Sequence, residues 1–175
     1  MNILKRIILF FGIFLLFGCG FIINNLSDRH PDYSINLSIK DDQSHPIKAG
    51  FAKVPITPSG FDTWNDIDNN ARYEPNKGDT YNDLNGNGTF DPVWIAGFHN
   101  KRPAQGIHDD IWARVMVLEI GDTRLAIVGL DAVGFLHDEV VDIRKSLSKS
   151  LQLDYCIIAS THNHEGPDLV GIWGE

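Results

Sequence analysis

Apolar residues follow a strand-like pattern in the second half of the chain. Residues 111–120 alternate as a half-buried strand does, and residues 123–130 form a second strand that is apolar over most of its length. Gly121 and Asp122 between them predict a tight turn, and therefore a hairpin. A third buried strand is expected at residues 155–160.

Residues 137–151 predict a helix between the second and third of these strands. Apolar side chains recur there at helical spacing, at Val140, Ile143, Leu147 and Leu151. A strand, a helix and a strand in this order predict two parallel strands joined by a right-handed crossover. We therefore expect an α/β fold with a mixed sheet, in which Leu130 and Ser160 end neighbouring or near-neighbouring strands at the same edge.

The first residues of the chain predict export. Lys5 and Arg6 precede an apolar run, residues 7–17, that is too short to cross a bilayer comfortably. The run ends in Leu-Phe-Gly-Cys, which resembles a bacterial lipoprotein signal that is cut before the cysteine. Residues 1–18 are then a signal peptide and Cys19 carries the lipid, which places the protein in the cell envelope, at the outer membrane or on the periplasmic side. An uncleaved N-terminal anchor would also place it at a membrane surface.

The polar residues 19–48 predict a tether, and the domain is expected to begin at residue 49 and extend to residue 175. Residues 49–58 predict a short strand, and because Pro55 lacks a backbone donor, it should lie at the sheet edge or at the end of its strand. The formal net charge of −8 argues against nucleic acid as a partner. With Cys19 lipidated, Cys156 is the remaining thiol, and its apolar strand favours a small core residue over a nucleophile.

An acidic repeat precedes the predicted hairpin. Residues 62–75 align with residues 79–92, 17 positions later, and both copies place oxygen-bearing side chains at alternate positions. This spacing is typical of loops that wind around a hard cation, which needs six to eight oxygen ligands. We also expect four aromatic side chains to fix the insertion in place: Trp64, Tyr73, Tyr81 and Phe90.

The second copy predicts a calcium loop, and the first copy predicts a weaker one. Candidate ligands in the second copy are Asp83, Asn85, Asn87, the Thr89 carbonyl and Asp91. Its turn position holds Gly88, whereas the first copy has Ala71 there, where a positive φ is costly. Candidate ligands in the first copy are Asp66, Asp68, Asn70 and Glu74. The alternative is an acidic solvated loop without an ion.

Two histidines follow the third strand. In an extended segment His162 and His164 would project to the same side and could face one metal ion or one substrate. They could equally cap the strand and bond to loop backbone. Asp131 follows the neighbouring strand, so a catalytic or ligand-orienting role and a loop-capping role are both open.

Several of these motifs together resemble the N-terminal part of the neutral/alkaline non-lysosomal ceramidase family. The resemblance rests on residues 49–58, 106–109, 113–114, 130–131 and 160–168, above all the Thr-His-x-His-x-Gly-Pro run. It implies a zinc-dependent amide hydrolase acting on N-acyl sphingolipids. It also implies that His162 is a zinc ligand and that His164 lies in the same site. The catalytic residues are not identified, and His164, His108 and Asp131 are the candidates.

The family's other zinc ligands lie further along its chains than residue 175. Within this chain His108 and Glu165 are candidate replacements only by residue type. The resemblance therefore predicts a fragment of a longer hydrolase with weak or no activity alone. The alternative is a calcium-stabilised surface lipoprotein that binds a ligand without chemistry.

Overall fold

The computed structural model describes residues 28–38 and 44–174. The chain divides into two compact units, residues 1–34 and residues 35–175. In the first unit the described part is a short turn, in which the His30 N–H donates to an Asp28 carboxylate oxygen at 2.7 Å. The predicted signal peptide and Cys19 lie outside the described residues.

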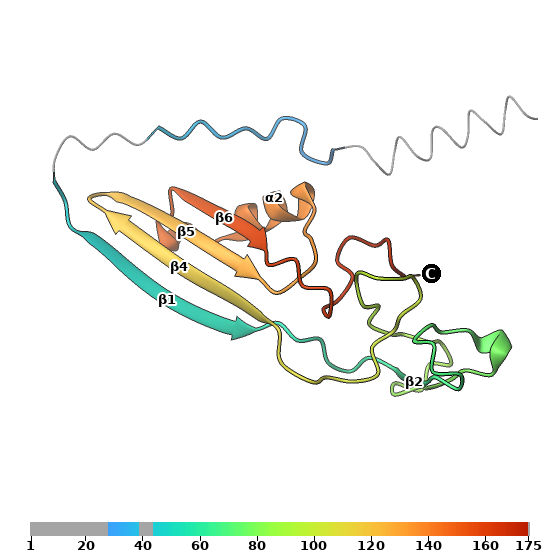
Figure 1. Ribbon diagram of the computed structural model, residues 1–175. Coiled ribbons are helices and arrows are strands. Elements are labelled where there is room, and N and C mark those ends of the chain that lie inside the picture. The colour runs from blue at the N-terminus through green and yellow to red at the C-terminus, as the bar shows by residue number, and fades with distance from the viewer. Residues whose placement is uncertain (1–27, 39–43, 175) are drawn as a thin grey trace, which may run out of the picture. The chain divides into compact units, whose positions relative to one another are not determined.

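The second unit contains a four-stranded mixed sheet in the order β1-β4-β5-β6 (Figure 1). Its strands are β1 (Ile47–Pro55), β4 (Trp112–Ile120), β5 (Thr123–Leu130) and β6 (Tyr155–Ser160). β4 and β5 form the predicted hairpin, and β5 pairs with β6 in parallel, with Leu130 opposite Ser160. The expected α/β class and the parallel strand-helix-strand unit are thus confirmed.

β1 is the edge strand that Pro55 predicted, and it pairs antiparallel with β4. All its residues are exposed, Phe51 to 76%. A row of alternating charges crosses the sheet, from Lys48 through Glu119 to Arg124. Hydrogen bonds from the two cations to Glu119 lower the pKa of that carboxyl to about 2.

The crossover helix is shorter than its apolar spacing predicts. Helix α2 spans His137–Ser146, and Leu147 leaves the helical region with ψ at 132°. A 3-10 turn, η2 (Lys149–Leu151), follows. The helix packs on β6, where Arg144 Nε donates to the Cys156 carbonyl at 2.7 Å. Cys156 is buried, and burial raises the pKa of its thiol, which agrees with a core role.

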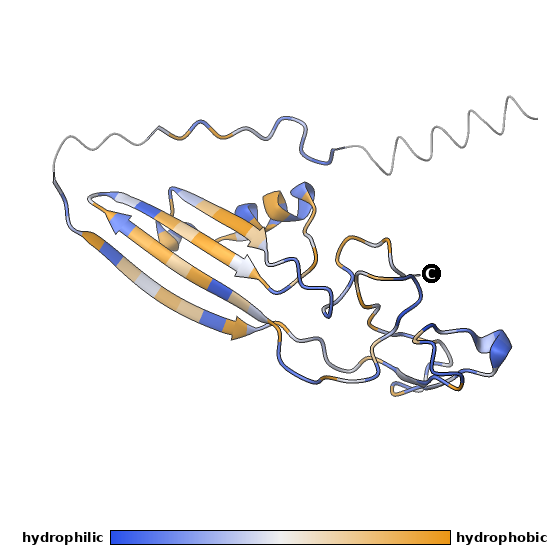
Figure 2. Ribbon diagram, in the orientation of Figure 1, coloured by the Kyte–Doolittle hydropathy of each residue, from blue (hydrophilic) through white to orange (hydrophobic). Residues whose placement is uncertain are grey.

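The acidic repeat folds into a separate loop region, β2 (Thr63–Asn65) and β3 (Thr80–Asn82) with the loops between and after them, which we call the loop module. Figure 2 shows apolar residues concentrated in the sheet strands and polar residues in this module. Its short turn η1 (Pro75–Lys77) lies between the two strands.

Aromatic rings form a small core for the loop module, as the sequence predicted. Trp64 and Tyr73 are buried, and their rings meet edge to face at 5.9 Å between centroids. Phe90 contacts both Tyr73 and Tyr81, at 4.3 and 5.0 Å. The contact between Tyr73 and Phe90 joins the first copy of the repeat to the second.

Candidate functional site

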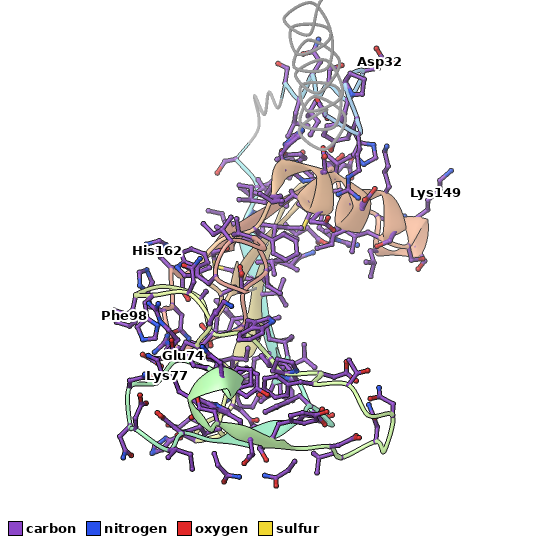
Figure 3. The ribbon with its side chains drawn as sticks, turned by 90° about the vertical axis from the view of Figure 1, so that its right-hand side faces the viewer. Asp32, Glu74, Lys77, Phe98, Lys149 and His162 are labelled. Atoms are coloured by element: carbon purple, nitrogen blue, oxygen red, sulfur yellow. The ribbon has the colours of Figure 1, made fainter. Side chains whose placement is uncertain are left out.

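The two imidazoles meet directly beyond the carboxyl end of β6. The Nε2 atoms of His162 and His164 lie 3.1 Å apart, and their ring centroids lie 4.7 Å apart. Figure 3 shows His162 and Phe98 on one side of the molecule, away from Lys149. The structure thus brings together the two histidines of the Thr-His-x-His motif.

A backbone turn, rather than strand alternation, produces this meeting. β6 ends at Ser160, and His162 adopts a left-handed conformation with φ of 62°. Such a φ is uncommon for a residue other than glycine and often marks functional sites. The extended segment expected from the sequence therefore stops two residues before the first histidine.

The backbone carbonyl of Val133 orients the His162 ring. His162 Nδ1 lies 2.8 Å from that oxygen. Because a carbonyl can only accept a hydrogen bond, Nδ1 carries the proton and Nε2 of the neutral ring is left with a free lone pair. Histidine ligands of metal ions are commonly held in this way. His164 Nε2–H can then donate to His162 Nε2 in the metal-free protein.

His164 lies against a loop that the sequence left unassigned. A Cβ built on Gly97 would lie 2.4 Å from His164 Nδ1, so the ring packs on bare backbone. The Phe98 ring meets the imidazole edge to face at 5.6 Å. Arg102 donates to the His164 carbonyl at 2.6 Å. Gly97, Phe98 and Arg102 are therefore site residues that sequence reasoning missed.

The imidazole pair fits two ligands of one metal ion. Two nitrogen ligands of tetrahedral zinc lie roughly 3.3 Å apart, given Zn–N bonds of about 2.05 Å. The 3.1 Å separation of the two Nε2 atoms is close to that value. A zinc ion held there would need further ligands and an open position for water.

Asp131 lies at the same sheet edge, but its carboxylate is already engaged. It accepts from Arg114 Nη1 at 2.6 and 2.7 Å and from the Trp112 N–H at 2.9 Å. Burial tends to raise the pKa of Asp131, but these hydrogen bonds outweigh it and hold the pKa below its usual value. Asp131 therefore joins β4 to the end of β5. The Thr161 hydroxyl also donates to the Asp131 carboxylate, at 3.4 Å.

The other candidate residues line a cavity of about 620 Å³. Its lining includes His108, Asp131 and Glu165 together with Asn163, but neither His162 nor His164. The exposed His108 ring contacts Asp109 at 2.6 Å. The structure thus places the imidazole pair outside the cavity that Asp131 and Glu165 line, although Glu165 directly follows His164 in the chain.

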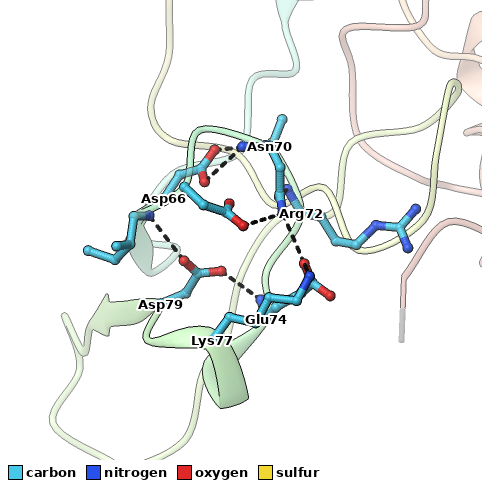
Figure 4. A network of polar contacts seen from close by, with 9 residues as sticks. Asp66, Asn70, Arg72, Glu74, Lys77 and Asp79 are labelled. Carbon is cyan, nitrogen blue, oxygen red and sulfur yellow. Dashed lines mark hydrogen bonds and ion pairs between the residues drawn. The ribbon is translucent and has the colours of Figure 1, made fainter.

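In the loop module, Asp66, Asp68 and Asp79 could together hold a metal ion. Each offers a carboxylate oxygen within 4.8 Å of the others. Figure 4 shows this network, in which Asp79 accepts the Glu74 N–H at 2.7 Å. Lys77 lies 2.7 Å from Glu74, and its hydrogen bond holds the pKa of that carboxyl below its usual value.

The two predicted calcium loops share one conformation. Asn69 and Ala71 of the first have positive φ, as do Gly86 and Gly88 at the matching positions of the second. Candidate ligand side chains contact one another in both loops. In the first loop, Asn70 Nδ2 lies 2.9 Å from a Glu74 carboxylate oxygen. In the second, Asp91 accepts from Asn87 Nδ2 at 2.7 Å and from Asn85 Nδ2 at 3.0 Å.

Backbone amides hold the first acid of each loop. Asp83 accepts the N–H groups of Gly88, Gly86 and Asn87, and Asp66 accepts those of Asn70 and Ala71. The bond from Gly88 makes the largest contribution to a pKa of Asp83 below its usual value. Ala71 thus takes the turn conformation that the sequence marked as costly.

Asp62 and Asp79 brace the loops across the repeat, which the sequence analysis did not predict. Asp62 accepts the N–H groups of Leu84 and Asp91 at 2.8 and 2.9 Å. Asp79 accepts those of Ile67 and Glu74 at 3.1 and 2.7 Å. Each acid opens one copy and binds the other, and both are buried. Their shared position in the repeat was the available signal.

No known protein family, curated protein or solved structure matches this chain. Among the described residues, no helix is long and apolar enough to span a bilayer.

Proposed function

We propose that this chain supplies His162 and His164 as ligands of a zinc-dependent amide hydrolase similar to neutral ceramidase. The observation that supports it is the 3.1 Å separation of the two Nε2 atoms, with His162 Nδ1 bound to the Val133 carbonyl. The resemblance of residues 160–168 to the Thr-His-x-His-x-Gly-Pro motif supplies the reaction class.

The residues of the chain divide the work of such a site. Val133 fixes the tautomer of His162, and Gly97 provides the surface on which His164 lies. Binding a metal through both Nε2 atoms requires the proton of the neutral His164 ring to be on Nδ1 instead of Nε2. Zinc held there would activate a water molecule and polarise the amide carbonyl of an N-acyl lipid.

Metal binding can be tested on the chain itself. Addition of Zn²⁺ should shift the Nε2 resonances of His162 and His164 in ¹⁵N NMR spectra. His162→Ala should remove this response, whereas His45→Ala should keep it, because His45 lies beside the distant hairpin turn at Gly121. A zinc response that survives His162→Ala and His164→Ala would contradict the proposal.

Catalysis can be tested on the protein produced from the complete reading frame. We expect bound zinc and hydrolysis of an N-acyl sphingosine, both lost in His162→Ala. A zinc-free protein, or hydrolysis unchanged by that substitution, would remove the assignment. Binding without hydrolysis would favour the alternative, a surface lipoprotein.

We further propose that the loop module binds calcium, with a structural role. The three carboxylates of Asp66, Asp68 and Asp79 that lie within 4.8 Å of one another support this, as does the contact of Asn87 with Asp91 in the second loop, since Ca²⁺ prefers six to eight oxygen ligands. The lipid anchor at Cys19 and a location in the cell envelope are part of the same proposal, and they rest on the N-terminal sequence alone. Palmitate labelling that is lost in Cys19→Ala would test the anchor.

A further inference from the structure

The Arg102 side chain contacts the segment that carries His164. Its Nη2 donates to two backbone carbonyls, of His164 at 2.6 Å and of Ala96 at 3.2 Å. Its Nη1 contacts both carboxylate oxygens of Glu165 at 3.3 Å. The planar guanidinium can make these contacts at once, whereas an ammonium is a single point donor.

These contacts connect two segments that are far apart in the sequence. Ala96 precedes Gly97, the residue under the His164 ring, and the Ala96 N–H donates to the Gly166 carbonyl at 3.0 Å. Arg102 also lies 5.0 Å from the centroid of the Phe98 ring, which borders the imidazole. The side chain of Arg102 is 16% exposed, so its carbonyl bonds are shielded from water.

We propose that Arg102 is a positioning residue, which directs the His164 imidazole at His162 by fixing the Gly97 backbone beneath it. Without the guanidinium, the carbonyls of Ala96 and His164 lose their shared donor, and these two carbonyls can move apart although the Ala96 N–H still donates to Gly166. The His164 ring then loses the surface that fixes its direction. The part of this inference that concerns metal affinity rests on the proposed function.

Three variants separate the carbonyl contacts from the ion pair. Arg102→Met removes both, and Arg102→Lys keeps the charge but cannot hold two carbonyls and a carboxylate. Glu165→Gln removes only the ion pair, and the Glu165 side chain is 69% exposed. Exposed pairs contribute little, so this change should leave the imidazole in place. Lys149→Met is a matched charge control far from the site (Figure 3).

Cobalt affinity and an NMR contact together provide the test. In Arg102→Met the Kd for Co²⁺ should rise about tenfold to a hundredfold, as for other groups that orient a ligand. The NOE between the His164 ring and the Gly97 Hα protons should disappear. Glu165→Gln should keep the NOE, and Lys149→Met should keep both the NOE and a Kd within about twofold of the unmodified chain.

Gly97→Ala provides an independent second variant. Its Cβ would lie 2.4 Å from His164 Nδ1, so the ring must move although Arg102 is intact, and the Kd should rise as in Arg102→Met. A stable Arg102→Met protein that retains both the NOE and the Co²⁺ affinity would overturn the inference. If the unmodified chain binds no cobalt through His162, the proposed function fails, while the NOE still decides the role of Arg102.

Discussion

The loop module and the histidine edge of the sheet are both candidate metal sites, but they are assembled in opposite ways. In each predicted calcium loop the candidate ligand side chains lie within nine residues of one another. At the sheet edge His162 depends on Val133, and His164 depends on Gly97 and Arg102. One site is encoded by short-range spacing and the other by contacts between distant segments.

This difference determines which changes each site tolerates. Side chains within a short loop can converge whenever that loop closes, so the loops depend on turn conformation and on their braces. The imidazole pair requires several segments to be placed correctly at once. A substitution at a position far away in the sequence, such as Gly97, should therefore affect the histidines more than the loops.

The largest effect is expected where the loop module itself depends on a contact between its two copies. Asp62→Ala removes a buried carboxylate that accepts the N–H groups of Leu84 and Asp91, which should cost roughly 3 kcal/mol of unfolding free energy. Chemical denaturation would measure the loss. Hydrogen exchange should show faster exchange in the second loop, not in the first.

Asp109→Ala is the matched control, because that side chain is 85% exposed. Its cost should stay within about 0.5 kcal/mol. Asp79→Ala should give the mirror result and expose the amides of Ile67 and Glu74. If each substitution loosened its own copy instead, the braces across the repeat would not operate.

Removal of calcium should have the next largest effect on stability. It should affect the loop module and leave the two histidines unaffected. Calcium at about 100 times its Kd would stabilise the native state by about 2.7 kcal/mol, which a chelator would remove. Hydrogen exchange should then speed up in the loop module and stay unchanged at residues 161–168. A chelator that leaves the loop module unaffected would contradict the calcium proposal.

The fold was predictable where a pattern extends over a whole element. The hairpin, the parallel pair and the edge position of β1 all follow from alternation, apolar runs and Pro55. The end of α2 was not predictable, because Leu147 continues the apolar spacing while its backbone leaves the helix. Apolar spacing reports which face is buried, not where the backbone turns.

The sites were predictable as residue types and not as geometry. The spacing of the histidines marked His162 and His164, but not the left-handed turn that brings their rings together. Arg102 lies 62 residues before His164, and no local pattern connects them. The 17-residue repeat marked both loops, and the same repeat carried the unrecognised signal for Asp62 and Asp79.

A smaller effect should come from the turn position that differs between the loops. Ala71 has φ of 58°, a conformation that costs a residue with a Cβ roughly 1 kcal/mol. Ala71→Gly should therefore stabilise the protein by about that amount, and Gly88→Ala should destabilise it similarly. A Cβ on Gly88 meets nothing within 4 Å, so its cost is conformational. Thermal unfolding of the two variants would measure both changes in stability. If both substitutions stabilised the protein, or both destabilised it, the shared loop conformation would be contradicted.

The smallest effect concerns two carboxyl groups whose pKa values are lowered by hydrogen-bond donors at different separations along the sequence. Asp83 is stabilised by amides of its own loop, and Asp131 by Arg114 and Trp112 of another strand. Because both folded pKa values lie below the unfolded value, each carboxylate stabilises the fold above the unfolded pKa. That contribution is lost as the pH falls through the folded pKa.

Arg114→Met should raise the pKa of Asp131, because the hydrogen bonds from Arg114 would no longer oppose the effect of burial. The pKa of Asp83 should stay unchanged. Titration of the carboxyl carbons by ¹³C NMR would measure both pKa values in one experiment. Lys149→Met provides the control for loss of one positive charge. If the Arg114 substitution moved both pKa values equally, a general charge effect would explain the result, and the contrast between local and long-range support would not hold for these acids.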